Sequence, residues 1–375
     1  MKLNRDLLLM ISEKFQNDRI SLYSCLLVNR SWCEAIVPIL WKIPGQAILT
    51  EKAENIIFNS TDLEESRDVL MKKGIDLFTE IYQKPSFNYI HFWRHLDLHL
   101  FDRIITRNFD KSDISMIRNE LLKLFVNNNT NFISLFFPYD YKCQVNWNIR
   151  CFSNLKYFYF CNDIDQNILK ELATVSKSIK IFNCDVVNCN DISGIIRLIE
   201  VQKNLDSVRI SRCDKYETWQ SIEEVLIKKA ITVQNLYLSY NWHFDVDLKF
   251  LSHFVNLKSL EIIECSRPPN QNGTILNLNQ SEKMSLPALK ILKTNQFGAK
   301  YKLLRSFLAN WKGRHTMLLQ IWPVNYILGH EKEVNRLYEL IEYYEAKGIV
   351  KKIDWEINWY NESEEFNWIK KRCFR

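Results

Sequence analysis

Apolar residues recur at helical spacing at the start of the chain. A first helix is predicted by residues that fall along one side of it: Leu3, Leu7, Leu8, Ile11 and Phe15. Asp18 is placed to cap a second helix, and a third is expected after Asn29. Helices this short bury few of their apolar side chains among themselves, so we expect a partner to cover part of their surface.

An apolar-x-x-apolar-x-apolar pattern recurs through the rest of the chain. Helical stretches separate its occurrences, as with the apolar residues between Ile164 and Val175 and between Val334 and Tyr344. This alternation predicts an α/β fold with a parallel sheet built from repeats. The pattern begins at Trp93, Phe132, Leu155, Ile179, Leu205, Val233, Leu257, Leu289, Leu318 and Val350.

Leucine-rich repeats favour Asn or Cys eight residues after each pattern start, where the chain turns off the sheet. Cys213, Asn241, Cys265 and Asn358 match this position, whereas several other repeats do not. The repeats therefore resemble a degenerate leucine-rich-repeat solenoid. The resemblance implies a horseshoe with a curved parallel sheet and outer helices.

The N-terminal segment closely resembles an F-box. In that family a Leu-Pro-x-acidic-Leu-Leu start is followed by Ile, a central Leu pair and Val-x-x-x-Trp. The resemblance implies docking on a Skp-type adaptor, and through it on a cullin-RING ubiquitin ligase. Asn4 replaces the family's proline, so weaker adaptor binding is expected. The implied adaptor-binding residues are Leu3, Leu7, Leu8, Ile11, Leu22, Leu26, Val28 and Trp32.

Three regions follow from these patterns: an F-box over residues 1–44, a helical linker and N-terminal cap of the solenoid over 45–90, and the solenoid over 91–375. Within the linker, a helix is expected through Leu63 to Lys73, ended by Gly74. The whole chain looks similar to an expanded fungal family of F-box proteins with leucine-rich-repeat-like solenoids.

The strand residues that do not point into the core are expected to line the concave sheet. Tyrosine, arginine and mixed polar side chains there suit a protein-binding surface. The alternative is an ordinary solvated sheet face. The candidate target-binding residues are Tyr157, Tyr159, Arg209, Tyr237, Glu261 and Lys293.

Composition narrows the function classes. Lys and Arg total 50 against 44 Asp and Glu, a net charge of +6 without a basic block, so nucleic acid is not expected as a partner. Only eight glycines are present and no phosphate-binding motif occurs, so no cofactor is expected. The ten cysteines form no Cys-x-x-Cys pair, and no apolar run is long enough for a membrane helix. We expect a cytoplasmic or nuclear protein with reduced thiols and no membrane partner.

His91, His95 and His99 are spaced as metal ligands would be on one helix face. A strand through Tyr89 to Leu100 explains this segment better, so no metal site is expected. No cysteine has a sequence neighbour that would activate it. The resemblance to an F-box implies that the chain is a non-catalytic substrate receptor of the ubiquitin ligase. The alternative is a protein-interaction scaffold whose degenerate F-box no longer engages a ligase.

Overall fold

The computed structural model describes residues 4–16, 18–42, 64–75, 86–110, 112–127, 130–137, 148–161, 164–187, 189–241, 248–265, 286–294, 305, 308–309, 311, 316–321 and 331–354. These residues form two compact units. The first comprises the described residues up to Tyr159 together with Thr174–Lys177. The second comprises Phe160–Ala173 and the described residues from Ser178 onwards.

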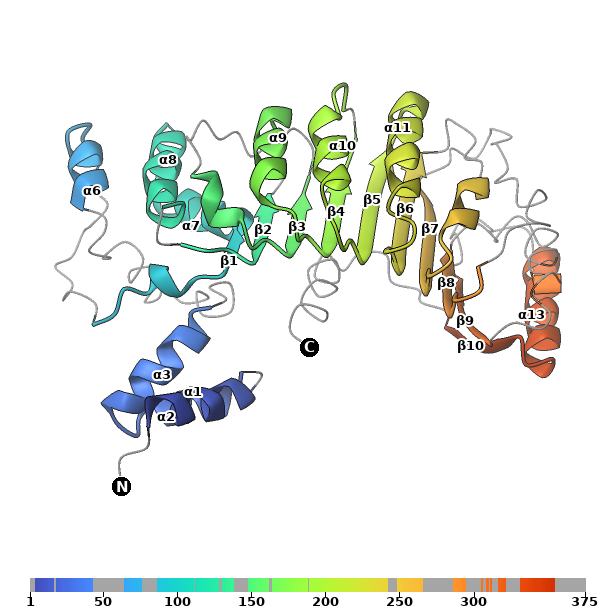
Figure 1. Ribbon diagram of the computed structural model, residues 1–375, viewed down its shortest axis with the longest axis horizontal. Helices are drawn as coiled ribbons and strands as arrows, with labels where there is room; N and C mark the ends of the chain where they lie inside the picture. The colour runs from blue at the N-terminus through green and yellow to red at the C-terminus, as the bar shows by residue number, and fades with distance from the viewer. Residues whose placement is uncertain are drawn as a thin grey trace. The chain divides into compact units, whose positions relative to one another are not determined.

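Three helices begin the first unit: α1 (Arg5–Lys14), α2 (Arg19–Leu26) and α3 (Arg30–Leu40). Both α1 and α2 pack against α3. Each helix starts at a residue whose side chain accepts a hydrogen bond from the backbone, namely Asn4, Asp18 and Asn29. The predicted three helices and the capping role of Asp18 are confirmed (Figure 1).

Further along, α6 (Glu64–Met71) ends before Gly74, which has a φ of 79°. The amide of Ile75 donates to the carbonyl of Leu70 at 3.0 Å, a helix C-terminal motif that requires the left-handed conformation at Gly74. The predicted helix and its glycine end are therefore confirmed.

The rest of the first unit alternates helices and strands. The short strand β1 (His95–Asp97) pairs in parallel with β2 (Ser134–Phe137). The other elements are η2 (Ile90–Phe92), α7 (Leu98–Asn108), α8 (Ile114–Phe125), η3 (Ile149–Phe152) and β3 (Tyr157–Phe160), the last of which reaches the unit boundary.

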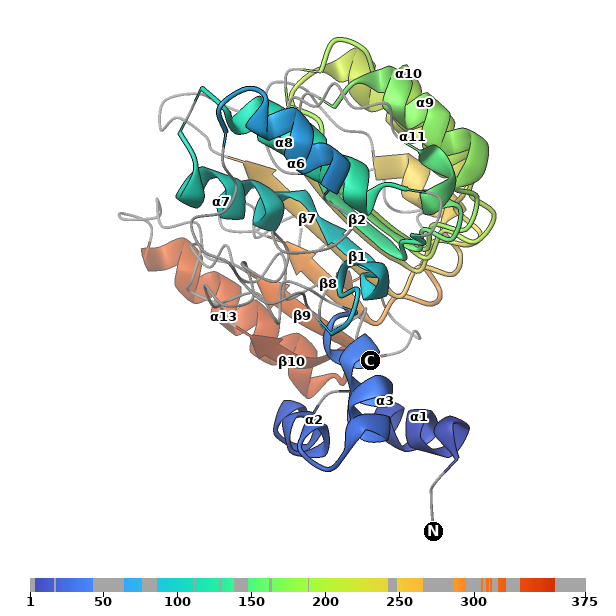
Figure 2. The same ribbon diagram turned by 90° about the vertical axis from the view of Figure 1, so that its left-hand side faces the viewer.

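The second unit is a parallel sheet with helices on one face. Strands β4 to β10 follow chain order in the sheet, and α9, α10 and α11 lie side by side over one of its faces (Figures 1 and 2). The bounds are α9 (Gln166–Val175), β4 (Ile181–Asp185), α10 (Ser193–Glu200), β5 (Ser207–Cys213), α11 (Tyr216–Ile227), β6 (Asn235–Asn241), η4 (Leu248–His253), β7 (Ser259–Cys265), β8 (Ile291–Thr294), β9 (Met317–Ile321), α13 (Glu331–Ala346) and β10 (Val350–Asp354).

One row of buried side chains runs across this sheet in register. Each member lies at the fourth position of the apolar pattern, and each pairs directly with the next strand's member. Burying this row contributes hydrophobic free energy that holds neighbouring repeats together. The row consists of Phe182, Val208, Leu236, Leu260, Leu292 and Leu319, all nearly inaccessible to solvent.

The repeats also share a backbone feature. The residue just before a strand accepts hydrogen bonds from two successive amides of the next repeat. The carbonyl of Lys180, for example, accepts from the amides of Asp206 and Ser207, both at 2.9 Å. Asp206 and Gln234 act in the same way one and two repeats later. These bonds satisfy buried main-chain groups where the helix returns to the sheet.

A strand lies at or just after every predicted pattern start, so the α/β class with a parallel sheet is confirmed. The pattern start at Leu318 is wrong by two residues. Leu292 pairs with Leu319, which places Thr316 at the first position of that repeat. Because Thr316 is polar, a search for apolar residues missed it. The predicted region boundaries at residues 44 and 90 stay predictions.

Candidate protein-binding surfaces

Exposed large apolar side chains concentrate on the first two helices. Leu7, Met10 and Ile11 lie three or four residues apart on α1 and so share one side of it. On α2 and the turn after it, Ile20 and Leu27 are 81% and 89% exposed. We call this set the apolar helix surface: Leu7, Met10, Ile11, Ile20, Tyr23, Leu27 and Val28.

The residues expected to bind an adaptor divide into two groups. Leu7, Ile11 and Val28 are exposed. Leu8 and Leu22 are buried, so they hold the helices together and are not available for direct contact. This corrects their assignment as contact residues. Leu26 and Trp32 are half-buried, and Leu3 lies outside the described residues.

Met10, Ile20, Tyr23 and Leu27 belong to the apolar helix surface but were not among the expected contacts. The F-box pattern does not contain them. Their signal in the sequence is helical spacing, because Ile20, Tyr23 and Leu27 recur every three or four residues on a side of α2 that Leu22 does not occupy.

A second candidate surface lies on the face of the sheet opposite α9, α10 and α11. Side chains alternate along a strand. The strand residues next to each member of the buried row therefore point to this face. Arg209 pairs with Tyr237, Tyr237 with Glu261, and Glu261 with Lys293 in neighbouring strands. Four of the six expected target-binding residues therefore lie in one row across β5 to β8.

The side chains of this row contact one another. The guanidinium carbon of Arg209 lies 3.5 Å from the centre of the Tyr237 ring, a cation–π arrangement. One guanidinium nitrogen also lies 3.9 Å from a carboxylate oxygen of Glu261. Arg209 thus reaches from β5 across Tyr237 to β7, and its charge is balanced within the row.

Burial alters the expected target-binding set. Arg209 is only 8% exposed, and the neighbouring Asn183 on β4 only 2%. In the first unit, Tyr159 is also buried and stacks on Phe136 with ring centres 4.3 Å apart. Arg209 and Tyr159 are therefore supporting residues here, which corrects their assignment as exposed contacts. Tyr157, Tyr237 and Glu261 are half-buried, and the side chain of Lys293 lies outside the description.

The three histidines lie in different elements: His91 in η2, His95 in β1 and His99 in α7. The predicted strand from Tyr89 to Leu100 is correct only at His95–Asp97, because Ile90–Phe92 form a 3-10 helix and α7 begins at Leu98. The Asp97 carboxylate accepts hydrogen bonds from the amides of His99 and Leu100, at 3.0 and 3.1 Å, and so starts a helix. Among the described residues, no group of three or more His, Cys, Asp or Glu side chains is arranged to hold a metal ion.

His95 has a distinct electrostatic environment. Its Nδ1 lies 2.7 Å from the hydroxyl oxygen of Ser134 on the neighbouring strand. Burial, together with the positive charges of Lys42 and Arg94, lowers the pKa of His95 to about 4. The imidazole is therefore neutral at physiological pH.

Three buried cysteines, Cys151, Cys184 and Cys213, are poor nucleophiles. Burial raises the pKa of Cys151 and of Cys213 to about 12, and it raises the pKa of Cys184 strongly. A thiol with such a pKa carries almost no thiolate at neutral pH. Cys213 follows the expected role at a repeat turn, where its Sγ donates to the carbonyl of Lys215 at 3.6 Å.

No protein-family model matches the chain, and no curated protein matches it. Within the described ranges, every helix is too short or too polar to span a bilayer.

Proposed function

We propose that this chain is an F-box-type substrate receptor of a Skp-cullin-F-box ubiquitin ligase. Helices α1 to α3 would bind a Skp-type adaptor, and the repeats would hold a target protein. The receptor itself would be non-catalytic, and it would act in the cytoplasm or nucleus. The resemblance of the N-terminal residues to an F-box supplies the identity of the partner.

The apolar helix surface is the observation that carries this proposal. Seven large apolar side chains are exposed within residues 7–28, although the same helices bury Leu8 and Leu22. Single exposed apolar residues are ordinary, but a concentration of this kind on adjacent helices is typical of a protein interface. Burial of Ile20 and Leu27 against an adaptor would contribute the most, because they are the most exposed of those on α2 and its turn.

The target would bind on the face of the repeats opposite α9, α10 and α11. Tyr237 and Glu261 are partly accessible there, and the more deeply buried Arg209 contacts both. Aromatic side chains fixed by neighbours lose little entropy on binding, which favours their use as contact residues. The horseshoe form of the repeats belongs to this proposal, since leucine-rich-repeat solenoids bind partners on their sheet.

Adaptor binding tests the proposal. Isothermal titration with a purified Skp-type adaptor should give a specific complex with the full chain. An Ile20→Asp/Leu27→Asp variant should lose at least about tenfold in affinity, because two buried contacts would be replaced by desolvated charges. Both side chains are exposed, so the fold should be unaffected.

The matched control is Val69→Asp/Met71→Asp, which places the same charges on two exposed apolar positions of α6. This variant should bind the adaptor like the unmodified chain. Failure of the folded, unmodified chain to bind would refute the ligase proposal and leave the scaffold interpretation.

A further inference from the structure

Lysines lie along the edge of the sheet where strands β4 to β8 begin. Lys180 directly precedes β4, Lys258 precedes β7 and Lys290 precedes β8, while Lys203 lies in the turn before β5. All four side chains are exposed. We call these four residues the basic edge.

Backbone hydrogen bonds connect the residues that directly precede these strands, and Lys180, Lys258 and Lys290 are three of them. The carbonyl of Lys180 accepts from Asp206 at 2.9 Å, Asp206 from Gln234 at 2.8 Å, Gln234 from Lys258 at 2.7 Å and Lys258 from Lys290 at 2.9 Å. Neighbouring parallel strands lie about 4.8 Å apart, so the basic edge extends over roughly 20 Å. That length fits an extended peptide of about six residues.

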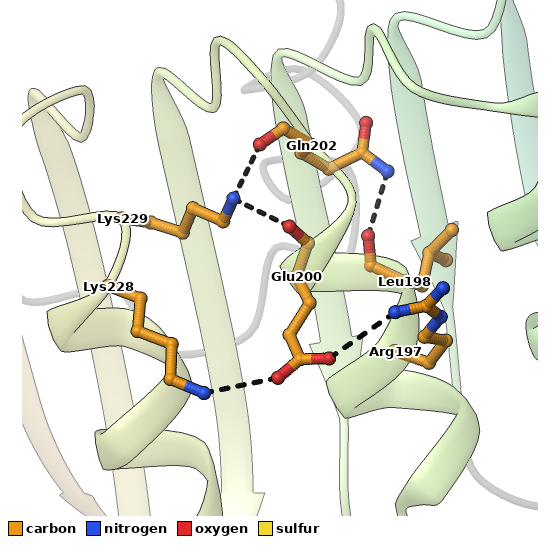
Figure 3. A network of polar contacts seen from close by, with 6 residues as sticks. All are labelled: Arg197, Leu198, Glu200, Gln202, Lys228 and Lys229. Atoms are coloured by element: carbon orange, nitrogen blue, oxygen red, sulfur yellow. Dashed lines mark hydrogen bonds and ion pairs between the residues drawn. The ribbon is translucent and has the colours of Figure 1, made fainter.

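The acidic residues near this edge are already engaged. The Glu200 carboxylate lies 3.1 Å from the ammonium of Lys228 and 3.8 Å from the guanidinium of Arg197 (Figure 3). Asp206 accepts a hydrogen bond from the Asn235 side chain at 3.4 Å. None of the four lysines pairs with an acidic side chain in the part of the chain that the structure describes. Their positive charge therefore faces solvent.

Two exposed apolar residues interrupt the lysines. Ile231 is 73% exposed in the turn before β6, and Val255 is 46% exposed in the turn before β7. The side-chain amide of Asn256 donates to the carbonyl of Ile231 at 2.8 Å and so joins the two turns. In chain order these residues are Lys180, Lys203, Ile231, Val255, Lys258 and Lys290, and Asp206 and Gln234 occupy the bonded positions between Lys180 and Lys258.

We propose that this edge is a docking surface for an acidic segment of a partner protein that also carries aliphatic side chains. The lysines complement the carboxylates, and Ile231 with Val255 would receive the aliphatic groups. This edge shares no residue with the apolar helix surface or with the row of Arg209, Tyr237, Glu261 and Lys293. None of its six residues is aromatic, so it lacks the stacking positions that single-stranded nucleic acid uses.

The test uses the full chain and a fluorescein-labelled peptide of Asp and Glu interrupted by leucines. Fluorescence anisotropy should show binding that weakens as salt is added. A Lys180→Glu/Lys258→Glu/Lys290→Glu variant should lose at least about tenfold in affinity at low salt. Replacing Ile231 and Val255 by Ser should weaken binding about threefold or more and leave the salt dependence unchanged.

The control variant is Lys72→Glu/Lys73→Glu/Lys170→Glu, which gives the same net charge by changing exposed lysines elsewhere. It should bind the peptide nearly as well as the unmodified chain. Circular dichroism establishes that each variant is folded. Equal loss in both triple variants, or tighter binding of poly(U) RNA than of the peptide, would overturn the proposal.

Discussion

The ammonium group of Lys229 donates a hydrogen bond to the main-chain carbonyl of Gln202 at 2.7 Å (Figure 3). It also donates to the carbonyl of Glu200 at 2.7 Å, and its partial burial lowers the pKa of Lys229. The Gln202 side chain in turn accepts from the amide of Ile179 at 2.8 Å and donates to the carbonyl of Leu198 at 2.8 Å. One lysine and one glutamine therefore connect the segments that precede β4, β5 and β6, and they satisfy carbonyls at the end of α10.

Replacing Lys229 by Met should lower the free energy of unfolding by about 2 kcal/mol, because two charge-assisted hydrogen bonds to carbonyls are lost. Lys228→Met is the matched control. The Lys228 ammonium makes only an exposed ion pair with Glu200, so its loss should cost less than about 0.5 kcal/mol. Urea denaturation of both variants measures the difference, and equal costs would contradict the role given to Lys229.

Gly194 allows α9 and α10 to lie close together. A Cβ atom at this position would come within 2.8 Å of the Leu169 Cβ and even closer to the carbonyl oxygen of Gln166. The same glutamine's side chain accepts from the amides of Gly194 and Ile195 at the start of α10, at 3.0 and 3.3 Å. Gly194→Ala should therefore destabilise the protein by roughly 1–3 kcal/mol, since backbone atoms must move.

Thermal and urea unfolding of Gly194→Ala should be compared with Ser193→Ala. The Ser193 side chain is exposed at the same helix start, so this control should change stability by less than about 0.5 kcal/mol. A neutral Gly194→Ala would show that the two helices are farther apart than described.

His95 should make the stability depend on pH. The pKa of His95 is about 4 in the folded protein and about 6.5 in the unfolded chain. As the pH falls, the unfolded chain therefore binds the proton at a higher pH than the folded protein does. The stabilisation is fully present above about pH 6.5 and is lost as the pH falls towards 4. At about pH 5 the loss should be about 2 kcal/mol relative to pH 7.5.

His95→Gln should remove this part of the pH dependence, because glutamine does not titrate in the window. His91→Gln, at an exposed position of η2, should leave it in place. Urea unfolding at the two pH values checks both. An unchanged loss of stability at pH 5 in His95→Gln would contradict this role, because Asp97 and Asp102, whose pKa values burial raises, would instead stabilise the fold as the pH falls.

The strands could be located from the sequence because one physical requirement repeats in each of them. Every repeat must present an apolar residue to the row that contains Val208 and Leu236, and the apolar search detects that residue. The search failed in the repeat of Leu319 because the pattern's first position there is Thr316. Pairing with the preceding strand, which is a long-range contact, fixes the register of this repeat.

The candidate surfaces were harder to predict from the sequence than the strands. Alternation along β5 correctly separates Arg209 from Val208, but it does not reveal that Arg209 is buried or that it stacks on Tyr237. The burial of Arg209 and its contact with Tyr237 depend on which side chains the neighbouring strands place beside it. In the same way, the F-box pattern groups Leu7 with Leu8, although one side chain is exposed and the other is buried.

Arg209 and Tyr237 should be energetically coupled. In a double-mutant cycle with Arg209→Met and Tyr237→Leu, we expect a coupling of about 1 kcal/mol, because each single change already removes the cation–π contact. Additive effects measured by urea denaturation would contradict this contact. Ser259 also lies on β7, but it pairs with Asn235 and so is outside the row of Arg209 and Tyr237. The double-mutant cycle of Arg209→Met with Ser259→Ala should therefore show little coupling.

Asn4 should tolerate the proline that is usual in F-boxes. Its φ of −64° is the value that proline imposes, and its carbonyl, which proline retains, accepts from the amide of Leu8 at 3.1 Å. The side-chain cap that would be lost is a long 3.4 Å bond at an exposed position. Asn4→Pro should therefore change the free energy of unfolding by less than about 0.5 kcal/mol.

Asn29 provides the contrast, because its φ of −171° is incompatible with a proline ring and its side chain caps α3 through the Trp32 amide at 3.1 Å. Asn29→Pro should cost roughly 2 kcal/mol or more. Urea denaturation distinguishes the two variants, and titration with a Skp-type adaptor then isolates the effect of position 4 on binding. If Asn4→Pro leaves both stability and adaptor affinity unchanged, the presence of asparagine at position 4 is not evidence that the F-box is degenerate. A large gain in affinity would instead show that the asparagine weakens the adaptor contact.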